Sequence, residues 1–187
     1  MRIISGKFKG KTISFLKSST TRPLKDSVKE SIFNIIAHSN LLEINLKNSN
    51  ILDLYSGIGS FGLECISRGA NKITFVERNK NTADVLKKNI FNLGVKKNVT
   101  VVIDETNNFL KKSFAEKFEI FFLDPPFKDE TYLKGLRSIK NNENFKKNHI
   151  IIIHRERGSL EDFSDILNPI LIKQYGRSKI IFGKFLR

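Results

Sequence analysis

Short apolar runs recur along the chain from residue 50 onward, and each is followed by a turn and then by a stretch with helical spacing. This alternation is typical of βαβ units built around a parallel sheet. The last two runs flank Gly176, Arg177 and Ser178, and a short turn between two apolar runs predicts an antiparallel hairpin. The sequence therefore predicts an α/β fold with a mostly parallel sheet and an antiparallel C-terminal hairpin. The expected strands cover residues 51–55, 73–76, 99–103, 120–123, 150–153, 170–175 and 179–185.

The beginning of the chain has a different pattern. Residues 1–22 alternate apolar and basic positions, with Gly6 and Gly10 as turn points, which predicts a basic β-hairpin. Residues 24–38 then place apolar side chains three and four positions apart, directly after Pro23, and this spacing predicts a helix. We therefore expect residues 1–40 to form a small N-terminal extension of hairpin and helix. Residues 41–187 would form the main domain, and the two parts would pack as one unit.

Length and charge narrow the class of protein. A chain of 187 residues suits one domain. Its 33 Lys and Arg against 19 Asp and Glu give a net charge of +14, which favours a nucleic-acid partner. No run approaches the roughly 18 apolar residues of a membrane-spanning helix, and no signal peptide follows Met1. The single cysteine, Cys65, offers too few thiolates for zinc. We expect a cytoplasmic protein with no membrane partner and no metal.

A glycine loop follows the first expected strand of the main domain. Gly57, Gly59 and Gly62 have the spacing G-x-G-x-x-G, directly after an apolar run and before a helical stretch. Glycines let the backbone approach a ligand, and the N-terminus of the next helix offers free N–H groups. The loop alone suits NAD, FAD or S-adenosyl-L-methionine, and a structural turn is the alternative.

Carboxylates near the loop favour S-adenosyl-L-methionine. Asp53 ends the first strand, where it would receive a cationic amino group or order the loop, and where a pyrophosphate would be repelled. Glu77 ends the second strand, where a carboxylate can accept both ribose hydroxyls of an adenosine, unless it is only a solvated charge. Either Asp104 or Glu105 would meet the adenine edge, because a shift of one residue exchanges them. The predicted cofactor contacts are Asp53, Tyr55, Ser56, Gly57, Gly59, Gly62, Glu77, Arg78, Asp104, Glu105 and Thr106.

The most specific motif is Asp124-Pro125-Pro126-Phe127, at the end of the fourth expected strand. Ligands bind at such strand ends in open α/β sheets. Prolines fix the backbone and carry no N–H, so the Asp124 side chain and the Pro125 carbonyl would accept hydrogen bonds from an exocyclic amino group, while Phe127 stacks on the base. The motif therefore predicts methyl transfer to the amino group of a nucleic-acid base by direct displacement. A rigid surface turn is the alternative.

RNA is the favoured substrate for such a site. A target base must be unstacked to reach it, and guanines in RNA loops meet this condition at little cost. Basic residues near the N-terminus would contact phosphates, which position the RNA without specifying its sequence, although each of them would equally suit a solvated face. The predicted RNA contacts are Arg2, Lys7, Lys9, Lys11, Arg22, Lys25 and Lys29.

With these motifs, the sequence resembles the RsmD family of bacterial 16S ribosomal RNA guanine-N2 methyltransferases over nearly its whole length. The resemblance rests on residues 2–10, Thr21-Arg22-Pro23 with the residues that follow, residues 52–70, Asp124 to Phe127, and Tyr175-Gly176-Arg177. It implies a Rossmann-like fold with a seven-stranded sheet, S-adenosyl-L-methionine as methyl donor, and methylation of guanine 966 of 16S rRNA. It also implies an assembled or partly assembled small ribosomal subunit as substrate, and we expect a monomer.

Two positions depart from that family, and three other functions compete. His154 stands where the family leads us to expect an acidic residue, and Asp104-Glu105 replaces an Asp-Ala pattern. A DNA adenine-N6 methyltransferase uses similar motifs but usually needs a target-recognition domain, for which this chain has little room. A non-catalytic RNA-binding assembly factor would not need the intact cofactor motifs. An NAD-dependent oxidoreductase would need a second substrate region, which the sequence does not contain.

Overall fold

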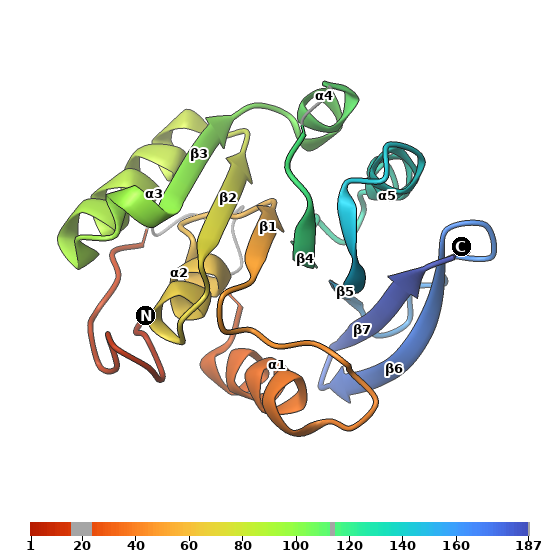
Figure 1. Cartoon of the computed structure of the whole chain (residues 1–187), viewed down its shortest axis with the longest axis horizontal. Helices are drawn as coiled ribbons and strands as arrows, with labels where there is room; N and C mark the ends of the chain where they lie inside the picture. The colour runs from red at the N-terminus through yellow and green to blue at the C-terminus, as the bar shows by residue number, and fades with distance from the viewer. Residues whose placement is uncertain (16–23, 113–114, 187) are drawn as a thin grey trace.

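A computed structural model describes residues 1–15, 24–112 and 115–186, and its centre is a seven-stranded sheet. The strands lie side by side in the order β3-β2-β1-β4-β5-β7-β6 (Figure 1). Strands β1 to β5 pair in parallel, whereas β7 pairs antiparallel with both β5 and β6. The predicted α/β fold with an antiparallel C-terminal hairpin is confirmed. The strand bounds are β1 Asn50–Leu54, β2 Lys72–Glu77, β3 Val99–Ile103, β4 Phe118–Leu123, β5 Phe145–Glu156, β6 Leu167–Tyr175 and β7 Ser178–Phe185.

The strand order reverses between β1 and β4. Strands β2 and β3 extend the sheet beside β1, and β5, β7 and β6 extend it beside β4. At such a reversal the connections leave in opposite directions, and ligands of α/β proteins bind in the crevice outside the C-terminal strand ends. Leu54 pairs with Leu123 at these ends. The segments that follow, starting at Tyr55 and Asp124, therefore begin next to each other.

Helices cover both faces of the sheet. Side chains of α1, α2 and α3 share one buried cluster with Ile51 and Phe75, and side chains of α4 and α5 share a second cluster with Leu52 and Leu54. Successive strand residues point to opposite faces, so a strand covered on both faces needs an unbroken apolar run. The helix bounds are α1 Asp26–His38, α2 Ser60–Ser67, α3 Lys80–Leu93, α4 Thr106–Lys111 and α5 Tyr132–Asn141.

The first 15 residues contain only a short part of the predicted β-hairpin. An isolated antiparallel bridge joins Arg2 to Thr12, and the N–H groups of Ile3 and Ile13 donate to the carbonyls of Lys11 and Met1 at 2.9 and 3.0 Å. The N–H groups of Ile4 and Ser5 instead donate to the carboxylate of Glu64 in α2, at 2.7 and 2.9 Å. Two N–H groups that could pair within a β-ladder are therefore bound by a side chain of α2. The alternating pattern of apolar and basic residues gave no indication of this contact. The rest of the predicted hairpin, from residue 16, lies outside the described residues.

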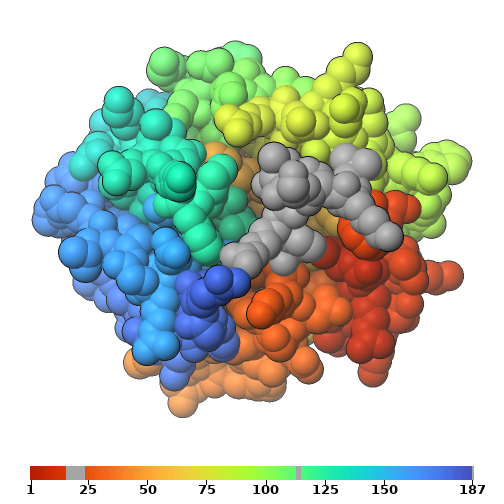
Figure 2. Space-filling view, turned by 180° about the vertical axis from the view of Figure 1, so that it is seen from behind, coloured from red at the N-terminus to blue at the C-terminus, as the bar shows by residue number. Residues whose placement is uncertain are grey.

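The N-terminal segment and α1 pack against the main domain. The expected helix at 24–38 is confirmed as α1, and its buried residues Val28 and Phe33 share a core cluster with Ile3 and with the sheet. Seen from behind, the red N-terminal segment lies between the orange α1 and the yellow-green α3 (Figure 2). Within the described part of the chain, no helix is long and apolar enough to cross a membrane.

Strand β5 is longer than its apolar run predicts. The four isoleucines at 150–153 are all 0% exposed, and they form the expected strand. The strand nevertheless begins at Phe145, opposite Phe118, has an irregularity in its pairing before Ile150, and continues through His154 to Glu156. Polar residues at both ends hid these extensions, and the longer strand brings His154 and Arg155 into the sheet.

Candidate active site

The glycine loop between β1 and α2 is held by the two predicted carboxylates. The N–H of Gly57 donates to Oε2 of Glu77 at 2.9 Å, and the N–H of Gly62 donates to Oδ2 of Asp53 at 3.0 Å. Gly57 and Gly59 have φ values of 55° and 84°, in the left-handed region that glycine adopts without strain. One of the two roles considered for Asp53, ordering the loop, is therefore visible in its hydrogen bond.

Asp53 also has an unused buried oxygen. Its side chain is 1% exposed, and Oδ1 has no hydrogen-bond partner among the described residues. Burial raises the pKa of this carboxyl well above its usual range, the hydrogen bond from Gly62 opposes the shift, and the nearby charges of Asp124 and Glu77 add to it. A buried carboxylate oxygen without a donor is costly. The site thus suits a ligand that brings a cationic donor.

The three glycines of the motif have different tasks. A Cβ on Gly59 would lie 2.4 Å from Leu86 Cδ1, and one on Gly62 would lie 2.3 Å from Phe75 Cε1. These two residues therefore allow the loop and helix α2 to pack closely on α3 and β2. A Cβ on Gly57 would have no atom within 4 Å, so Gly57 faces open space. Gly57 is the glycine that a ligand would approach.

The remaining predicted cofactor residues surround the same strand ends. Tyr55 has a φ of 61°, and burial, followed by the charge of Asp129, raises the pKa of its hydroxyl. Ser56 is buried, and its hydroxyl donates to the carbonyl of Val76 at 3.3 Å. Thr106, also buried, is the first residue of α4. These side chains lie near the C-terminal ends of β1 and β3, where the sequence predicted cofactor contacts.

Asp104 and Glu105 both have partners in the structure. Lys112 Nζ lies 2.7 Å from Oδ2 of Asp104, and this hydrogen bond is the main cause that lowers the Asp104 pKa. Arg78 Nη1 lies 3.4 Å from Oε1 of Glu105. Two predicted cofactor residues, Arg78 and Glu105, therefore contact each other. Glu105 is the more exposed of the two carboxylates, with 56% of its side chain exposed against 22% for Asp104.

The Asp-Pro-Pro-Phe segment begins where β4 ends, beside β1. The N–H of Asp124 faces the carbonyl of Leu54 at 3.5 Å. Pro125 is buried, Pro126 is exposed, and Phe127 is partly exposed. No described residue donates a hydrogen bond to the Pro125 carbonyl. The acceptor predicted for a substrate amino group is therefore available.

Arg155 of β5 holds this segment, and it is not among the site residues predicted from the sequence. Its guanidinium donates to the carbonyls of Pro126 and Phe127 at 3.1 and 2.8 Å. The side chain is only 3% exposed, lies 3.3 Å from Glu161, and stacks over the ring of Tyr132 at 4.7 Å. A buried charge of this kind needs several fixed partners, and its burial became visible only in the structure, since the predicted strand ended at residue 153.

His154 occupies the site side by side with Asp124. Its Nδ1 lies 2.8 Å from Oδ1 of Asp124. Its ring also meets the ring of Phe127 edge to face, with centroids 5.7 Å apart and an interplanar angle of 77°. The residue that departs from the expected family pattern therefore contacts two predicted catalytic residues.

One predicted RNA contact is wrong. Lys29 is 0% exposed, and its Nζ lies 3.7 Å from Glu64, 3.0 Å from the carbonyl of Arg2 and 3.3 Å from the hydroxyl of Ser60. This lysine connects the N-terminal segment to α2. Because it is fully buried, it cannot contact a phosphate of RNA. Arg22 lies outside the described residues. The other predicted contacts are exposed at the surface, namely Arg2, Lys7, Lys9, Lys11 and Lys25.

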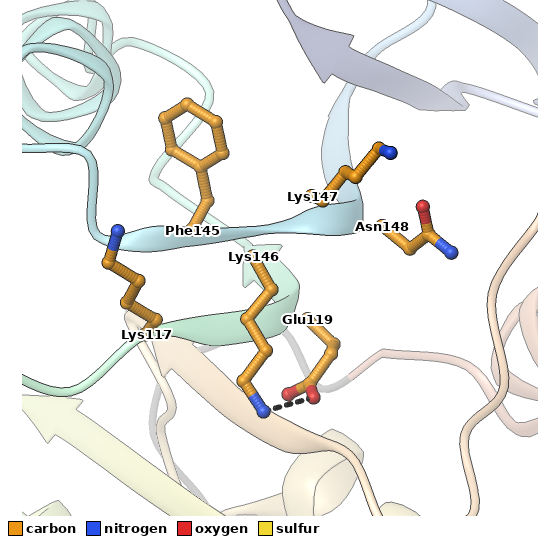
Figure 3. Close-up of a pocket in the computed structure, with 6 residues that line it drawn as sticks. All are labelled: Lys117, Glu119, Phe145, Lys146, Lys147 and Asn148. Carbon is orange, nitrogen blue, oxygen red and sulfur yellow. Dashed lines mark hydrogen bonds and ion pairs between the residues drawn. The ribbon is translucent and has the colours of Figure 1, made fainter.

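A separate hollow lies at the opposite end of the sheet. It has a volume of about 510 Å³ and is lined by Lys117 and Glu119 at the start of β4 and by residues 145–148 at the start of β5 (Figure 3). Lys146 spans it to Glu119 with an ion pair of 2.5 Å. This hollow contains none of the predicted site residues. Among the described residues, no cluster of three or more histidine, cysteine or acidic side chains could hold a metal ion.

The chain is similar in sequence to one protein family and to several named bacterial proteins. The model of a family described as Conserved hypothetical protein 95 matches residues 1–184. A Buchnera aphidicola protein named Ribosomal RNA small subunit methyltransferase D is 36% identical over 155 residues, covering 83% of this chain and 78% of the relative. A Haemophilus influenzae protein of the same name is 35% identical over 159 residues, covering 84% of this chain and 79% of the relative.

Solved structures agree with the fold. One from Escherichia coli, named as a candidate methyltransferase, has a TM-score of 0.85 and 25% identity and covers 99% of this chain and 97% of its own. One from Haemophilus influenzae, named as a candidate methylase, has a TM-score of 0.79 and 28% identity and covers 100% of this chain and 98% of its own. The Rossmann-like arrangement predicted from the sequence is confirmed.

Proposed function

The chain belongs to the family described as Conserved hypothetical protein 95, and from this premise we propose that it is an S-adenosyl-L-methionine-dependent methyltransferase that modifies the N2 amino group of a guanine in 16S rRNA. The names of its relatives in Buchnera and Haemophilus support methylation of small-subunit ribosomal RNA. The guanine, and position 966 in particular, come from the family resemblance of the sequence.

The residues at the ends of β1 and β2 fit the methyl donor. The unpaired Oδ1 of Asp53 would accept a hydrogen bond from the donor's cationic amino group, and this contact would favour the ionised form of a carboxyl whose pKa burial has raised. Gly57 leaves open space at the turn. Glu77 would receive the ribose hydroxyls in addition to the N–H groups of Gly57 and Asn79 that it already accepts. When bound, the donor supplies a methyl group on a positively charged sulfur that leaves as a neutral thioether.

The residues at the end of β4 fit the acceptor. The lone pair of a guanine amino group is delocalised into the ring, so this nitrogen is a weak nucleophile. Asp124 and the Pro125 carbonyl would accept its two N–H groups and hold the nitrogen with its lone pair directed at the methyl carbon. Alignment of this kind accounts for much of the rate in a direct displacement. The nitrogen loses one proton as the new N–C bond forms, and Asp124 is the nearest carboxylate to receive it.

The observation that carries the proposal is the adjacency of Asp53 and Asp124. Asp53 of β1 pairs with Phe122 of β4, and Asp124 directly follows the last residue of β4. The charge of Asp124 contributes to the raised pKa of Asp53. Donor and acceptor would therefore meet in one crevice. A site with its two halves on separate edges of the sheet could not transfer a methyl group.

Net charge and exposed lysines support an RNA substrate presented by the ribosomal subunit. The net charge of +14 attracts phosphate, and the exposed basic residues of the N-terminal segment would position the RNA. The relatives act on small-subunit ribosomal RNA by name, so we place the protein in the cytoplasm, where ribosomes assemble. We further propose that it acts as a monomer on an assembled or partly assembled subunit.

The decisive experiment uses purified protein, isotopically labelled donor and small subunits that lack the modification. The labelled nucleotide is mapped by mass spectrometry after nuclease digestion. We expect one methyl group per subunit, on N2 of a single guanine. Label on adenine in duplex DNA would instead support the DNA methyltransferase alternative, and RNA binding without label transfer or donor binding would support a non-catalytic assembly factor.

A further inference from the structure

We infer that His154 is a positioning residue of the acceptor site, which fixes Asp124 and Phe127 in the arrangement that a target base requires. This inference rests on the proposed function. Leu123 of β4 pairs with Ile153 of β5, so the next residue of each parallel strand is Asp124 and His154. The two side chains are neighbours because of the strand register, and both are mostly buried, with 24% and 13% of their surface exposed.

The hydrogen bond from His154 gives the two carboxylate oxygens of Asp124 different roles. An ionised carboxylate only accepts hydrogen bonds, so at 2.8 Å Nδ1 of His154 donates to Oδ1. The imidazole therefore carries a proton on Nδ1. No described residue donates to Oδ2, which leaves this oxygen as the acceptor for a substrate amino group. Without His154, the carboxyl group could rotate, and its two oxygens would exchange places.

The same ring supports the predicted stacking surface. The edge-to-face contact of His154 with Phe127 is an arrangement that aromatic rings prefer. It restricts rotation of the phenylalanine side chain. One imidazole thus holds both the hydrogen-bonding group and the aromatic face against which the base would lie.

Arg155 completes the support from the other side of the strand. Successive residues of a strand point to opposite faces of the sheet, and Arg155 donates to the carbonyls of Pro126 and Phe127. His154 therefore controls the side chains of the segment at 124–127, while Arg155 controls its backbone.

The test compares two substitutions at one position. In His154→Asn the side-chain amide can donate to Asp124 roughly where Nδ1 does, whereas His154→Leu fills similar space without a donor. We expect His154→Leu to lower kcat about ten- to a hundredfold, the size of effect that misplacement of a reacting group produces, with little change in the KM for S-adenosyl-L-methionine. We expect His154→Asn to recover most of the kcat.

A second histidine of β5 provides the control. His149 is buried, its Nδ1 lies 2.8 Å from the carbonyl of Lys146, and its Nε2 accepts from the N–H of Phe185 at 3.0 Å. His149→Leu should lower the melting temperature and leave kcat of the folded enzyme near the wild-type value. This variant shows what a purely structural loss on the same strand does.

The possible results separate cleanly. A wild-type-like kcat for His154→Leu, or an equal loss in the Asn and Leu variants, would overturn the positioning role. A fall of donor affinity together with kcat would assign His154 to the cofactor site instead and would equally overturn it. Wild-type protein that transfers no methyl group to any subunit would refute the proposed function. An active wild type whose kcat does not change on substitution of His154 would refute only the positioning role.

Discussion

The guanidinium of Arg155 donates to the main-chain carbonyl of Phe127 at 2.8 Å. A side chain of β5 thereby fixes the backbone that follows β4, and a second donor of the same group reaches the carbonyl of Pro126. The two prolines of the segment cannot donate to the sheet, so this contact supplies an anchor that the backbone itself lacks.

Two substitutions of Arg155 should separate its contribution to protein stability from its contribution to the geometry of the candidate active site. Arg155→Ala leaves the buried Glu161 with Lys179 as its remaining ion-pair partner, and loss of one member of a buried pair costs about 3 kcal/mol. Arg155→Lys keeps the charge but loses the two parallel donors, so it should cost less in stability and still lower kcat severalfold. Urea denaturation and turnover measured on both variants test this order, and a fully active Arg155→Ala would contradict it.

Substitution of Asp124 should remove turnover and spare donor binding. In Asp124→Ala the acceptor for the amino group is gone, and loss of one preorganised group at a reacting centre typically costs 10²- to about 10³-fold in kcat. Calorimetry should give a donor affinity close to that of the wild type. Asp84→Ala, an exposed aspartate on α3, is the matched control. A strong loss of donor affinity would move Asp124 into the cofactor site.

The pKa of Asp53 predicts an unusual dependence of stability on pH. Because burial raises this pKa above its value in the unfolded chain, the folded state binds the proton more tightly. The resulting stabilisation is complete below the unfolded pKa and is lost as pH rises through the folded pKa. Asp53→Asn keeps the acceptor for Gly62 and cannot ionise, so the variant should gain stability relative to the wild type as pH rises. Its donor affinity should fall.

Chemical denaturation at several pH values measures this difference. The free energies of unfolding of Asp53→Asn and the wild type should be furthest apart at the highest pH and should converge in acid. A difference that does not change with pH would show that Asp53 has the same pKa in the folded and unfolded chain.

Substitution by alanine should have different effects at Gly57 and at Gly62. Gly62→Ala would press a Cβ against Phe75 and Ile73, at 2.3 and 2.9 Å, and overpacking of this kind costs about 1–3 kcal/mol. Gly57→Ala meets no atom but adopts a φ of 55°, a strain of about 1 kcal/mol. We therefore expect Gly62→Ala to reduce the melting temperature more, and Gly57→Ala to reduce donor affinity more. The opposite ranking would reassign which glycine faces the ligand.

Exposed lysines of the N-terminal segment should govern the salt dependence of RNA binding. Each phosphate contact that is lost lowers the slope of log affinity against log salt by about 1. A triple substitution of Lys7, Lys9 and Lys11 to alanine should therefore lower the slope by about 2–3. The control changes the same charge elsewhere, with alanine at the exposed residues Lys88, Lys96 and Lys97. Equal slopes for both triple variants would point to the general field of the protein rather than to a local contact.

Periodicity predicted the body of the fold well because its strands are buried on both sides. Apolar runs such as Ile150–Ile153 are continuous where helices cover both faces, and the order of strands and helices then follows. Strand ends were predicted less well, since β5 begins at Phe145 and the polar residues 146–149 form an irregularity in its pairing with β4. At the N-terminus the alternation of side chains predicted a hairpin, but its arms pair only around Arg2 and Thr12, and the carboxylate of Glu64 binds the backbone of Ile4 and Ser5.

Motifs predicted the strand ends at which the site lies, but not the contacts that support it. Each motif directly follows or ends a strand, and β1 lies between β2 and β4 in the sheet. The strand ends therefore bring together the glycine loop, Asp53, Glu77 and Asp124. Arg155 escaped notice because its partners are carbonyls 28 and 29 residues away in the chain. Lys29 was misassigned for a similar reason, since its exposure depends on Glu64, which lies in a different helix. Long-range partners of charged residues are not encoded in local spacing.

The place of β7 affects how the protein is made. The last strand of the chain pairs with β5 and separates it from β6, and the N–H of Phe185 near its end donates to His149. While the nascent chain is still emerging, folding of the N-terminal part leaves one edge of β5 open, and open edges invite pairing with other chains. Strand β7 therefore has to be synthesised before β5, with its four buried isoleucines, is paired on both sides.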